Sequence, residues 1–483
     1  MMIIIVVLAY FALLFAISRW TGRRATNETF YRADRKSPWY MVAFGMVGAS
    51  ISGVTFVSVP GMVGRMQMTY LQTCMGFILG YVVVAFVLLP LFYRMNVISI
   101  YAYLGRRLGM TSQRTGASFF LLSKMAGASV KFYVVCIILQ RFVFDLLGVP
   151  FAVTVVLLVL LIWLYTRQGG IKTLVWTDSL QTLCLFTALL LIIYKVVSDL
   201  GMSVGDAVAA VSENDLSRVF VFDDWLSTQN FWKQFLSGVF IVLVMTGLDQ
   251  DMMQKNLTCK TLRGAQKDMC SYGVAFLPAN LLFLSLGVLL TLWYQQRGLA
   301  LPAAGDELLP QFISLTSHHS PLTSIFVLGI LAASFSSADS ALASLTTIYC
   351  VDIRQRAGDE RLRKRAHVAM CALFVLFILG FRAVNSTSLI DDIYMIVSYT
   401  YGPLLGLFAY GIVTRRPVCD RLVPYVAVAS PLLCFAVDWL TQLLWNYHFG
   451  YELLMLNGLL TFVMLSVTAN LNANHNVNLN ANR

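Results

Sequence analysis

A hydroxyl-rich stretch, GILAASFSSADSALASLTT at residues 329–347, lies between two strongly apolar segments of the chain. Four of its residues recur at i, i+3, i+4 and i+7 and would share one face of a helix: Ala333, Ser336, Ser337 and Ser340. One carbonyl and three hydroxyls on such a face suit a hard monovalent cation that prefers neutral oxygen ligands. The same small residues would also serve close helix packing, with the hydroxyls bonded back to carbonyls of the preceding turn.

Ionisable residues also occur inside apolar segments. A carboxylate near mid-membrane, such as Asp339, costs at least ~2.5–3.5 kcal/mol unless it is partnered or solvated, so it marks a functional site by default. The same argument applies to four more residues: Asp178 in LVWTDSLQTL, Lys124 and Lys131 on one helical face, and Asp249 in VMTGLDQDMMQKNLTCK. Simpler explanations remain open, since Asp178 could cap its helix and the lysines could snorkel or pair.

A second irregular stretch, FGMVGASISGVTFVSVPG at 44–61, favours a break in its helix. Glycine, hydroxyl and proline residues make unwinding near 48–53 easy: Gly48, Ser50, Ser52, Gly53, Thr55 and Pro60. Broken backbone at membrane depth is tolerated only where it lines a cavity or is buried in protein, and its freed carbonyls can bind a small cation. Close packing through small residues is the alternative.

These residues must be positioned by membrane helices. The chain has 483 residues, of which 58% are hydrophobic and 12% charged, a composition typical of a polytopic all-α membrane protein. About thirteen apolar runs approach the length of a membrane span. They cover 2–18, 39–62, 69–93, 115–143, 149–166, 175–198, 231–253, 270–294, 321–348, 367–388, 391–413, 422–442 and 448–468. The first lacks a basic head and a cleavage site and is predicted to be a retained span.

Lysine and arginine predict the orientation of these spans. Most of the 35 basic residues fall in alternate loops, at 19–36, 94–114, 167–172, 255–267, 354–365 and 415–421. The opposite loops receive only Arg65, Lys195, Arg218, Lys233, Arg297 and Arg382. The basic loops and the C-terminus are therefore predicted to be cytoplasmic and the N-terminus outside. The net charge of +11 reflects this topology and does not indicate a nucleic-acid partner.

Several classes of protein lack support in the sequence. The predicted loops are too short for a soluble domain, so residues 1–483 form one transmembrane domain, with an Asn-rich tail at 470–483 that is predicted to be disordered. No GxxxxGK[ST] motif indicates an ATP-driven pump. The nine cysteines are scattered and no metal or nucleophile–base arrangement occurs, so we predict neither an enzyme nor a cofactor.

The chain resembles the sodium:solute symporter family, to which the sodium–glucose, proline and sialic acid cotransporters belong. The resemblance extends over roughly 1–470 and is carried by seven stretches in the family's order. They are FYRADRKSPWYMVAFGMVGASISG, PLFYRMNVISIYAYLGRRLG, GGIKTLVWTDSLQ, DQDMMQKNLTCKTLRGAQK, DELLPQFI, SSADSALASLTT and GPLLGLFAYGIV. It implies a LeuT-like inverted repeat of five plus five helices at about 39–198 and 231–413, with one extra helix before the repeats and two after them.

The resemblance also implies binding residues. A sodium ion would be held by the backbone carbonyls of Gly48, Ile51 and Ala333 and the hydroxyls of Ser336 and Ser337. A possible second cation site would use Asp178, Ser340 and Asp339, the last of which departs from the serine of the sialic acid transporters. The solute would contact the following residues: Ser50, Ser52, Thr55, Gln72 and Asp249, with Lys124 or, after a small shift, Lys131 as its cation.

The function implied is sodium-coupled secondary active import of a small organic solute by alternating access. A cation at the solute site favours an anion such as sialic acid or a monocarboxylate. Proton-coupled symport and sodium/sugar cotransport are the alternatives. The expected partners are Na⁺, the solute and the lipid bilayer, and the expected location is a bacterial inner membrane. The solute's identity, the number of coupled ions and the oligomeric state stay open.

Overall fold

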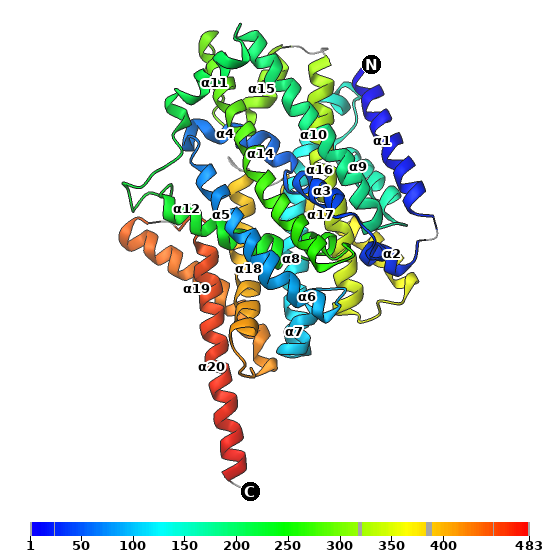
Figure 1. Ribbon diagram of the computed structural model, residues 1–483, viewed down its shortest axis with the longest axis vertical. Helices are drawn as coiled ribbons and strands as arrows, with labels where there is room; N and C mark the ends of the chain where they lie inside the picture. Colours follow the sequence, from blue (N-terminus) through cyan, green and yellow to red (C-terminus); the bar gives the residue numbers. More distant parts are fainter. Residues whose placement is uncertain (1, 24, 317–320, 383–388, 448, 482–483) are drawn as a thin grey trace.

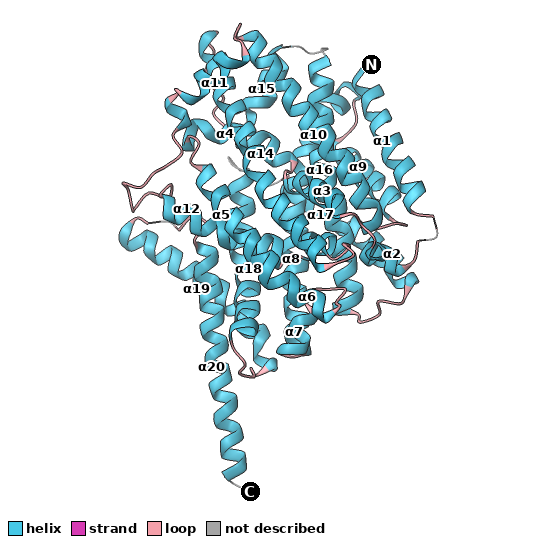
Figure 2. Cartoon of the chain, in the orientation of Figure 1, coloured by secondary structure: helices cyan, strands magenta, loops and turns pink. Residues whose placement is uncertain are grey.

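The computed structural model describes residues 2–23, 25–316, 321–382, 389–447 and 449–481, and this part of the chain is helical, with no β-strand (Figure 2). Helices suit apolar segments because each satisfies its own peptide groups where no water is present. The α-helices are α1 (Met2–Thr21), α2 (Asn27–Arg32), α3 (Trp39–Ser50), α4 (Gly53–Met66), α5 (Tyr70–Val83), α6 (Leu89–Met95), α7 (Ala102–Arg107), α8 (Met110–Leu139), α9 (Phe151–Thr166), α10 (Ile171–Asp199), α11 (Val204–Ser212), α12 (Phe231–Val242), α13 (Gln250–Asn256), α14 (Leu262–Gln296), α15 (Leu308–Thr316), α16 (Pro321–Ile348), α17 (Glu360–Phe381), α18 (Leu389–Val413), α19 (Val423–Trp445) and α20 (Leu453–Ala481). Short 3-10 or π-helical turns are η1 (Ala33–Arg35), η2 (Val84–Leu88), η3 (Gln140–Phe144), η4 (Asp145–Leu147), η5 (Asp215–Ser217), η6 (Leu243–Gly247), η7 (Gly305–Glu307), η8 (Tyr349–Ile353) and η9 (Asp420–Leu422).

Nine helices of the described part of the chain are long and apolar enough to cross a membrane, or up to eleven if each of two bent pairs counts as one span. The bent pairs are α3 with α4, at 58°, and α12–η6 with α13, at 69°. Two shorter apolar helices are Phe151–Thr166 and Leu453–Ala469. In the described part of the chain, every segment that hydropathy predicted as a span overlaps one of these elements. Residues 383–388 of the predicted span 367–388 and residue 448 of the span 448–468 lie outside the described residues. The total of about thirteen crossings stays a prediction.

The first bend lies where glycine and hydroxyl residues predicted it. Helix α3 ends at Ser50, and Ile51 (φ −81°, ψ 89°) and Ser52 (φ −78°, ψ 171°) leave the helical conformation before α4 begins. The residue that follows, Gly53, approaches α16 closely, because a Cβ at this position would displace the hydroxyl of Ser334. The break therefore lies in direct contact with α16, the hydroxyl-rich helix.

The second bend follows the π-helical turn η6, which ends at Gly247. Leu248 (φ −109°, ψ 6°) and Asp249 (φ −96°, ψ 118°) are not helical. The chain turns helical again because the Asp249 carboxylate accepts a hydrogen bond of 2.8 Å from the backbone N–H of Asp251, which caps α13. Asp249, which the sequence indicated as a functional residue, thus also caps the N-terminus of α13.

Helix α16 forms the centre of the bundle (Figure 1). It packs against α10, α8, α3, α4 and α17, and 89% of its most apolar window is buried. By contrast, only 22% of the corresponding window of α1 and 28% of that of α19 are buried. The serines of α16 consequently face protein and not the lipid side of the bundle.

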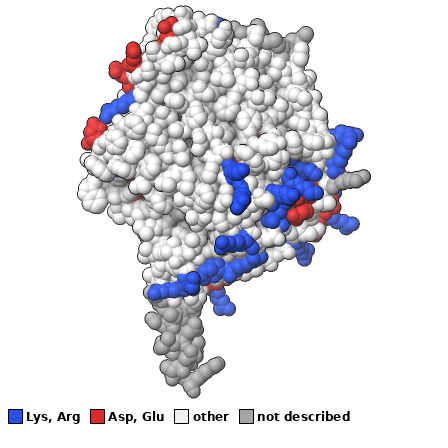
Figure 3. All heavy atoms as spheres, in the orientation of Figure 1, with Lys and Arg blue, Asp and Glu red and all other residues white. Residues whose placement is uncertain are grey.

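Charged side chains are distributed unevenly over the surface. Lysines and arginines gather over the lower part of the face in Figure 3, around α2, α6 and α7, while aspartates and glutamates stand out at the upper left. This segregation agrees with the basic loops predicted from the sequence. The assignment of that side to the cytoplasm stays a prediction.

The last helix continues into the Asn-rich segment. Helix α20 extends beyond the bundle to Ala481 (Figure 1); residues 482–483 lie outside the described part of the chain, and the disordered tail predicted at 470–483 stays a prediction. Adding a residue to an existing helix needs no new nucleus, so a polar tail that continues an apolar helix can remain helical. The repeat boundaries 39–198 and 231–413 stay a prediction, although each predicted repeat begins with one of the two bent pairs.

Candidate functional site

Two serines of α16 connect it to the first break and to α10. Ser337 Oγ donates a hydrogen bond of 2.8 Å to the backbone oxygen of Ala49, near the end of α3. It lies 3.5 Å from the carbonyl of Ala333 in its own helix. Ser336 Oγ donates a bond of 2.8 Å to Asp178 Oδ1 on α10. Because the last carbonyls of a helix have no N–H four residues ahead, the break exposes peptide oxygens beside these hydroxyls.

The residues predicted for the first cation site lie around this break. Gly48 belongs to the last turn of α3, Ile51 lies in the break, and both are buried. The carbonyl of Ala49 is an additional oxygen that sequence reasoning missed. Gly48 has a role of its own, because a Cβ there would collide with the Thr182 side chain on α10. The backbones of α3 and α10 can approach only because position 48 lacks a side chain.

Asp178 has a cationic partner that the sequence interpretation did not identify. Its Oδ2 lies 2.8 Å from Nζ of Lys255, and both side chains are at most 2% exposed. Lys255 was counted among the basic residues of a loop at 255–267, but the structure places it in the last turn of α13, inside the bundle. The polar spacing in DQDMMQKN could have indicated this, since Asp251, Gln254 and Lys255 share one helical face.

Asp339 is satisfied separately from Asp178. The Tyr165 hydroxyl on α9 donates a hydrogen bond of 2.6 Å to Asp339 Oδ2, and Ser340 Oγ donates one of 3.3 Å to Asp339 Oδ1. Hydroxyl donors therefore take the place of a cation at this carboxylate. The residues of the predicted second cation site have different hydrogen-bond partners, with Asp178 at Ser336 and Asp339 at Tyr165 and Ser340. The two carboxylates nevertheless lie close enough to interact electrostatically with each other and with Lys255.

A cavity of about 90 Å³ opens beside the first break. Three residues predicted to contact the solute, Ser50, Ser52 and Thr55, line it, and so does Lys131 of α8. Its wall also contains a chain of hydroxyls, in which Ser50 bonds to Tyr272 of α14 and Tyr81 of α5 donates to Tyr272 at 2.7 Å. The sequence did not indicate that the two tyrosines line this cavity, because they are 191 residues apart in the chain.

Gln72 does not line this cavity. Its amide nitrogen donates to the backbone oxygen of Gln229 at 2.9 Å, and its amide oxygen accepts the N–H of Val221 at 3.2 Å. The side chain holds the segment that precedes α12, and its contact with the solute stays a prediction.

Lys124 and Asp249, both predicted to contact the solute, bind each other, and with Lys131 and Ser337 they line a second cavity of about 40 Å³. Their contact with the solute stays a prediction. Lys124 Nζ lies 3.0 Å from Asp249 Oδ2 and 2.8 Å from Asp251 Oδ2. The Tyr401 hydroxyl of α18 donates to Asp249 Oδ2 at 2.7 Å. This network, which we call the Lys124 network, joins α8, α13 and α18 and neutralises the lysine. Lys131, by contrast, forms no ion pair with any residue in the described ranges.

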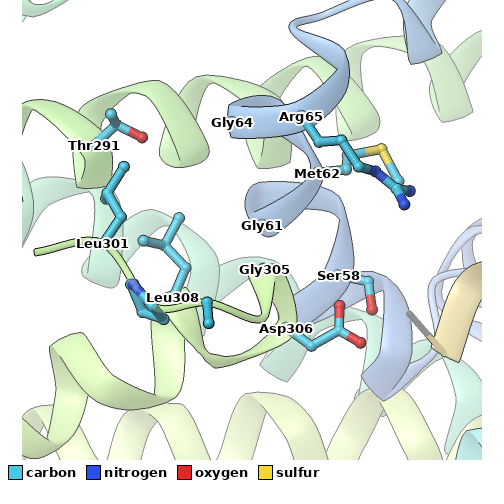
Figure 4. Close-up of a pocket in the computed structure, with 12 residues that line it drawn as sticks. Ser58, Gly61, Met62, Gly64, Arg65, Thr291, Leu301, Gly305, Asp306 and Leu308 are labelled. Atoms are coloured by element: carbon cyan, nitrogen blue, oxygen red, sulfur yellow. The ribbon is translucent and has the colours of Figure 1, made fainter. Parts of the chain in front are cut away.

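A larger pocket, of about 500 Å³, lies along the second half of α4 (Figure 4). Its polar side chains are those of Ser58, Arg65, Thr291 and Asp306. Here the segment containing η7 packs directly on α4, since a Cβ on Gly61 would overlap the backbone of Gly305. Helix α4 therefore runs from the 90 Å³ cavity at its start to this open pocket at its end.

Known proteins resemble this chain in sequence and in fold. The model of the sodium:solute symporter family matches residues 30–418. The sodium-dependent multivitamin transporter of Oryctolagus cuniculus is 27% identical over 393 residues, which are 78% of this chain and 60% of that protein. The sodium/sialic acid symporter NanT of Aliivibrio fischeri is 23% identical over 494 residues, 99% of this chain and 96% of that protein. A solved Na⁺-coupled sialic acid symporter in a substrate-bound, outward-open state is 20% identical and shares the fold, with a TM-score of 0.80 over 98% of both chains.

The Lys124 network generates a stability prediction. Replacing Lys124 with methionine leaves the Asp249 and Asp251 carboxylates buried without their cation, and we expect a loss of about 3–5 kcal/mol of unfolding free energy. Lys131→Met removes a charge that has no carboxylate partner, so it is expected to leave the stability unchanged or to raise it. Thermal unfolding in detergent, monitored by intrinsic fluorescence, compares the two variants with the unmodified chain.

A neutralised variant provides the control. Lys124→Met combined with Asp249→Asn and Asp251→Asn removes all three charges and should recover most of the lost thermal stability. Equal unfolding midpoints for Lys124→Met and Lys131→Met would show that the ion pairs of the Lys124 network contribute nothing.

Proposed function

The chain belongs to the sodium:solute symporter family, and we propose that it imports a small organic anion together with Na⁺, with Lys131 as the cation that selects the anion. The observation that carries this proposal is the position of Lys131. It lines the cavity beside the broken helix with three hydroxyl residues, while the other lysine of α8, Lys124, is neutralised by two aspartates.

Na⁺ would bind at the break in α3. We assign its ligands to the carbonyls of Gly48, Ile51 and Ala333 and the hydroxyls of Ser336 and Ser337. Neutral oxygens of this kind suit a hard monovalent ion. Asp178 supports the arrangement indirectly, because it accepts a hydrogen bond from the Ser336 hydroxyl, which leaves the lone pairs of that oxygen available to the ion.

An acidic solute fits the second half of the site. A lysine and a carboxylate removed from water form a charge-assisted hydrogen bond about twice as strong as a neutral one. The hydroxyls of Ser50, Ser52 and Thr55 provide donors and acceptors for the remaining polar groups of the solute. Relatives of this chain include sodium/sialic acid symporters and a sodium-coupled monocarboxylate transporter, whose named solutes are acids. A neutral sugar would leave the Lys131 charge without a partner.

The two ends of the site indicate how access alternates. The cavity of about 90 Å³ is smaller than the ~300 Å³ typical of ligand pockets, so the Ser50–Tyr272–Tyr81 wall must move when a solute enters. The open pocket along α4 (Figure 4) forms the outer approach. Lys124 lies seven residues, or about 10 Å of helix, nearer the basic loops than Lys131, so the Lys124 network closes the cytoplasmic side.

The driving force can be estimated for one ion. A tenfold Na⁺ gradient supplies ~1.4 kcal/mol, and a membrane potential of 100 mV adds ~2.3 kcal/mol per elementary charge. A monovalent anion moving with a single Na⁺ carries no net charge and uses only the first of these. We place the chain in the cell membrane, with the basic loops and the C-terminus in the cytoplasm and the N-terminus outside.

One prediction of this proposal concerns the binding of Na⁺. Ser336→Ala with Ser337→Ala removes two of the five proposed ligands, and we expect the Na⁺ concentration for half-maximal effect to rise at least about tenfold, which corresponds to ~1.4 kcal/mol. The midpoint of thermal unfolding, titrated with NaCl at constant ionic strength against KCl, measures Na⁺ binding without knowledge of the solute.

Ser344→Ala is the matched control. This serine is buried in the same helix, but its hydroxyl bonds only to the Ala341 carbonyl, at 2.9 Å. It should retain the unmodified Na⁺ titration. If the double variant retained it as well, the assignment of the ion to the serine face would be wrong.

The second prediction concerns the solute. Loss of a charge-assisted bond of ~1.5–3 kcal/mol should weaken the binding of an acid by roughly 10- to 150-fold, so Lys131→Gln is expected to lose uptake of sialic acid and of pyruvate at low concentration. Lys131→Arg keeps the charge and should retain it. Proteoliposomes with an inward Na⁺ gradient provide the assay, with galactose as the neutral comparison.

The methyl ester of each acid tests the same contact from the ligand side. The unmodified protein should prefer the acid to its ester, and Lys131→Gln should show no preference. Transport of galactose but of neither acid by the unmodified protein would contradict an anionic solute.

A further inference from the structure

We propose that the ammonium of Lys255 is a built-in cation at the Asp178 carboxylate, and that it replaces a second Na⁺, so that each solute moves with one sodium ion. The inference rests on the sodium-coupled symport proposed above and concerns the number of coupled ions. Asp178, Asp339 and Ser340 were the residues predicted to hold a second ion, and the structure shows what occupies the first of them.

The geometry of the pair supports this role. Lys255 Nζ lies 2.8 Å from Asp178 Oδ2, a distance typical of a charge-assisted contact. Lys255 is 1% exposed and Asp178 0%. A lysine buried to this degree requires a counter-ion, since an isolated ammonium in an apolar interior is strongly unfavourable. Each side chain therefore requires the other, and the ion pair is a permanent part of the bundle.

The ammonium also lies next to the proposed Na⁺ site. Asp178 uses its other oxygen, Oδ1, to accept the hydrogen bond from Ser336, one of the serines assigned to the ion. Both carboxylate oxygens thus have partners, one cationic and one neutral. A second Na⁺ at Asp178 would have to displace Lys255 or share the carboxylate with it, and two like charges at that separation repel each other in a medium of low dielectric.

The rest of the predicted second site provides no substitute. Asp339 receives hydroxyl bonds from Tyr165 and Ser340 at its two oxygens. Each oxygen thus accepts one hydroxyl bond, and the two donor hydrogens oppose the approach of a cation along those directions. The Lys255 ammonium also interacts electrostatically with Asp339, so one tethered cation serves both carboxylates of the predicted second site.

The position of Lys255 has a consequence for the reaction cycle. Lys255 belongs to α13, which follows the second helix break, and Asp178 belongs to α10. A Na⁺ at that carboxylate would arrive and leave in each cycle, whereas a tethered ammonium remains. With one mobile Na⁺ and a monovalent anion, transport is electroneutral and responds to the Na⁺ gradient alone.

Binding of ²²Na⁺ to the purified full-length protein tests the inference without a solute. A scintillation proximity titration, calibrated with the protein concentration, gives the number of ions bound and the Hill coefficient. We expect one Na⁺ per chain and a Hill coefficient near 1. Lys255→Gln, which frees the Asp178 carboxylate, is expected to bind two Na⁺ with a Hill coefficient approaching 2.

Two further variants separate charge from folding. Lys255→Arg keeps a cation at Asp178 and should bind one Na⁺. Lys255→Met with Asp178→Asn removes both charges, leaves no buried ion unpaired, and should also bind one. If Lys255→Gln fails to fold, the unmodified protein and this double variant still decide the question.

The outcomes are distinct. Two Na⁺ bound per unmodified chain, or one Na⁺ bound to folded Lys255→Gln, would overturn the inference while leaving sodium-coupled symport intact. Absence of any saturable ²²Na⁺ binding to the unmodified protein would remove the proposed function, and this inference with it.

Discussion

The break between α3 and α4 is the constraint on which the site depends. An apolar environment has no water to satisfy peptide groups, so a helix interrupted at membrane depth must find partners in the surrounding protein. The Ser337 hydroxyl provides such a partner, because it donates a hydrogen bond to the Ala49 carbonyl. Its neighbour Ser336 donates a hydrogen bond to Asp178 on α10. The break, the serine helix and α10 consequently form one unit. The absence of a side chain at Gly48 contributes to this unit, because a Cβ there would prevent α3 from approaching Thr182 on α10.

Buried charges follow a comparable rule. Two of the intramembrane cations have carboxylates at ion-pair distance: Lys255 has Asp178, and Lys124 has Asp249 and Asp251. Lys131 lies on the same helix as Lys124 and lines the cavity without a carboxylate partner in the described part of the chain. An uncompensated charge at that depth is costly, and a protein retains such a charge where a ligand of opposite sign completes it. The electrostatic pattern, and not the fold, is the basis on which we propose an anionic solute.

The sequence predicted the fold and its irregular positions well, because both are local properties. Long apolar runs specify membrane helices, and glycine with hydroxyl residues at 48–53 marked the first break. Partner choice was harder to predict, because it depends on packing between distant helices. Lys255 was interpreted as a loop residue because it stands at the end of an apolar run among other basic residues. Lys255 and Asp178 are 77 residues apart in the sequence, and their pairing depends on how α13 bends into the bundle after Asp249. The choice between Lys124 and Lys131 was open for the same reason.

The shared use of a few residues explains how an ion and a solute can be coupled in this chain. The backbone that ends α3 contributes carbonyls to the proposed Na⁺ site, and the same turn carries Ser50 and Ser52, which line the solute cavity. An ion held between this turn and α16 would fix the positions of those hydroxyls before a solute arrives. Ser50 also bonds to Tyr272, so the turn reaches the wall that must move on entry. Binding energy at the ion site is thereby available to organise the solute site, because Gly48 and Ile51 of the proposed ion site alternate along the chain with Ser50 and Ser52 of the cavity wall.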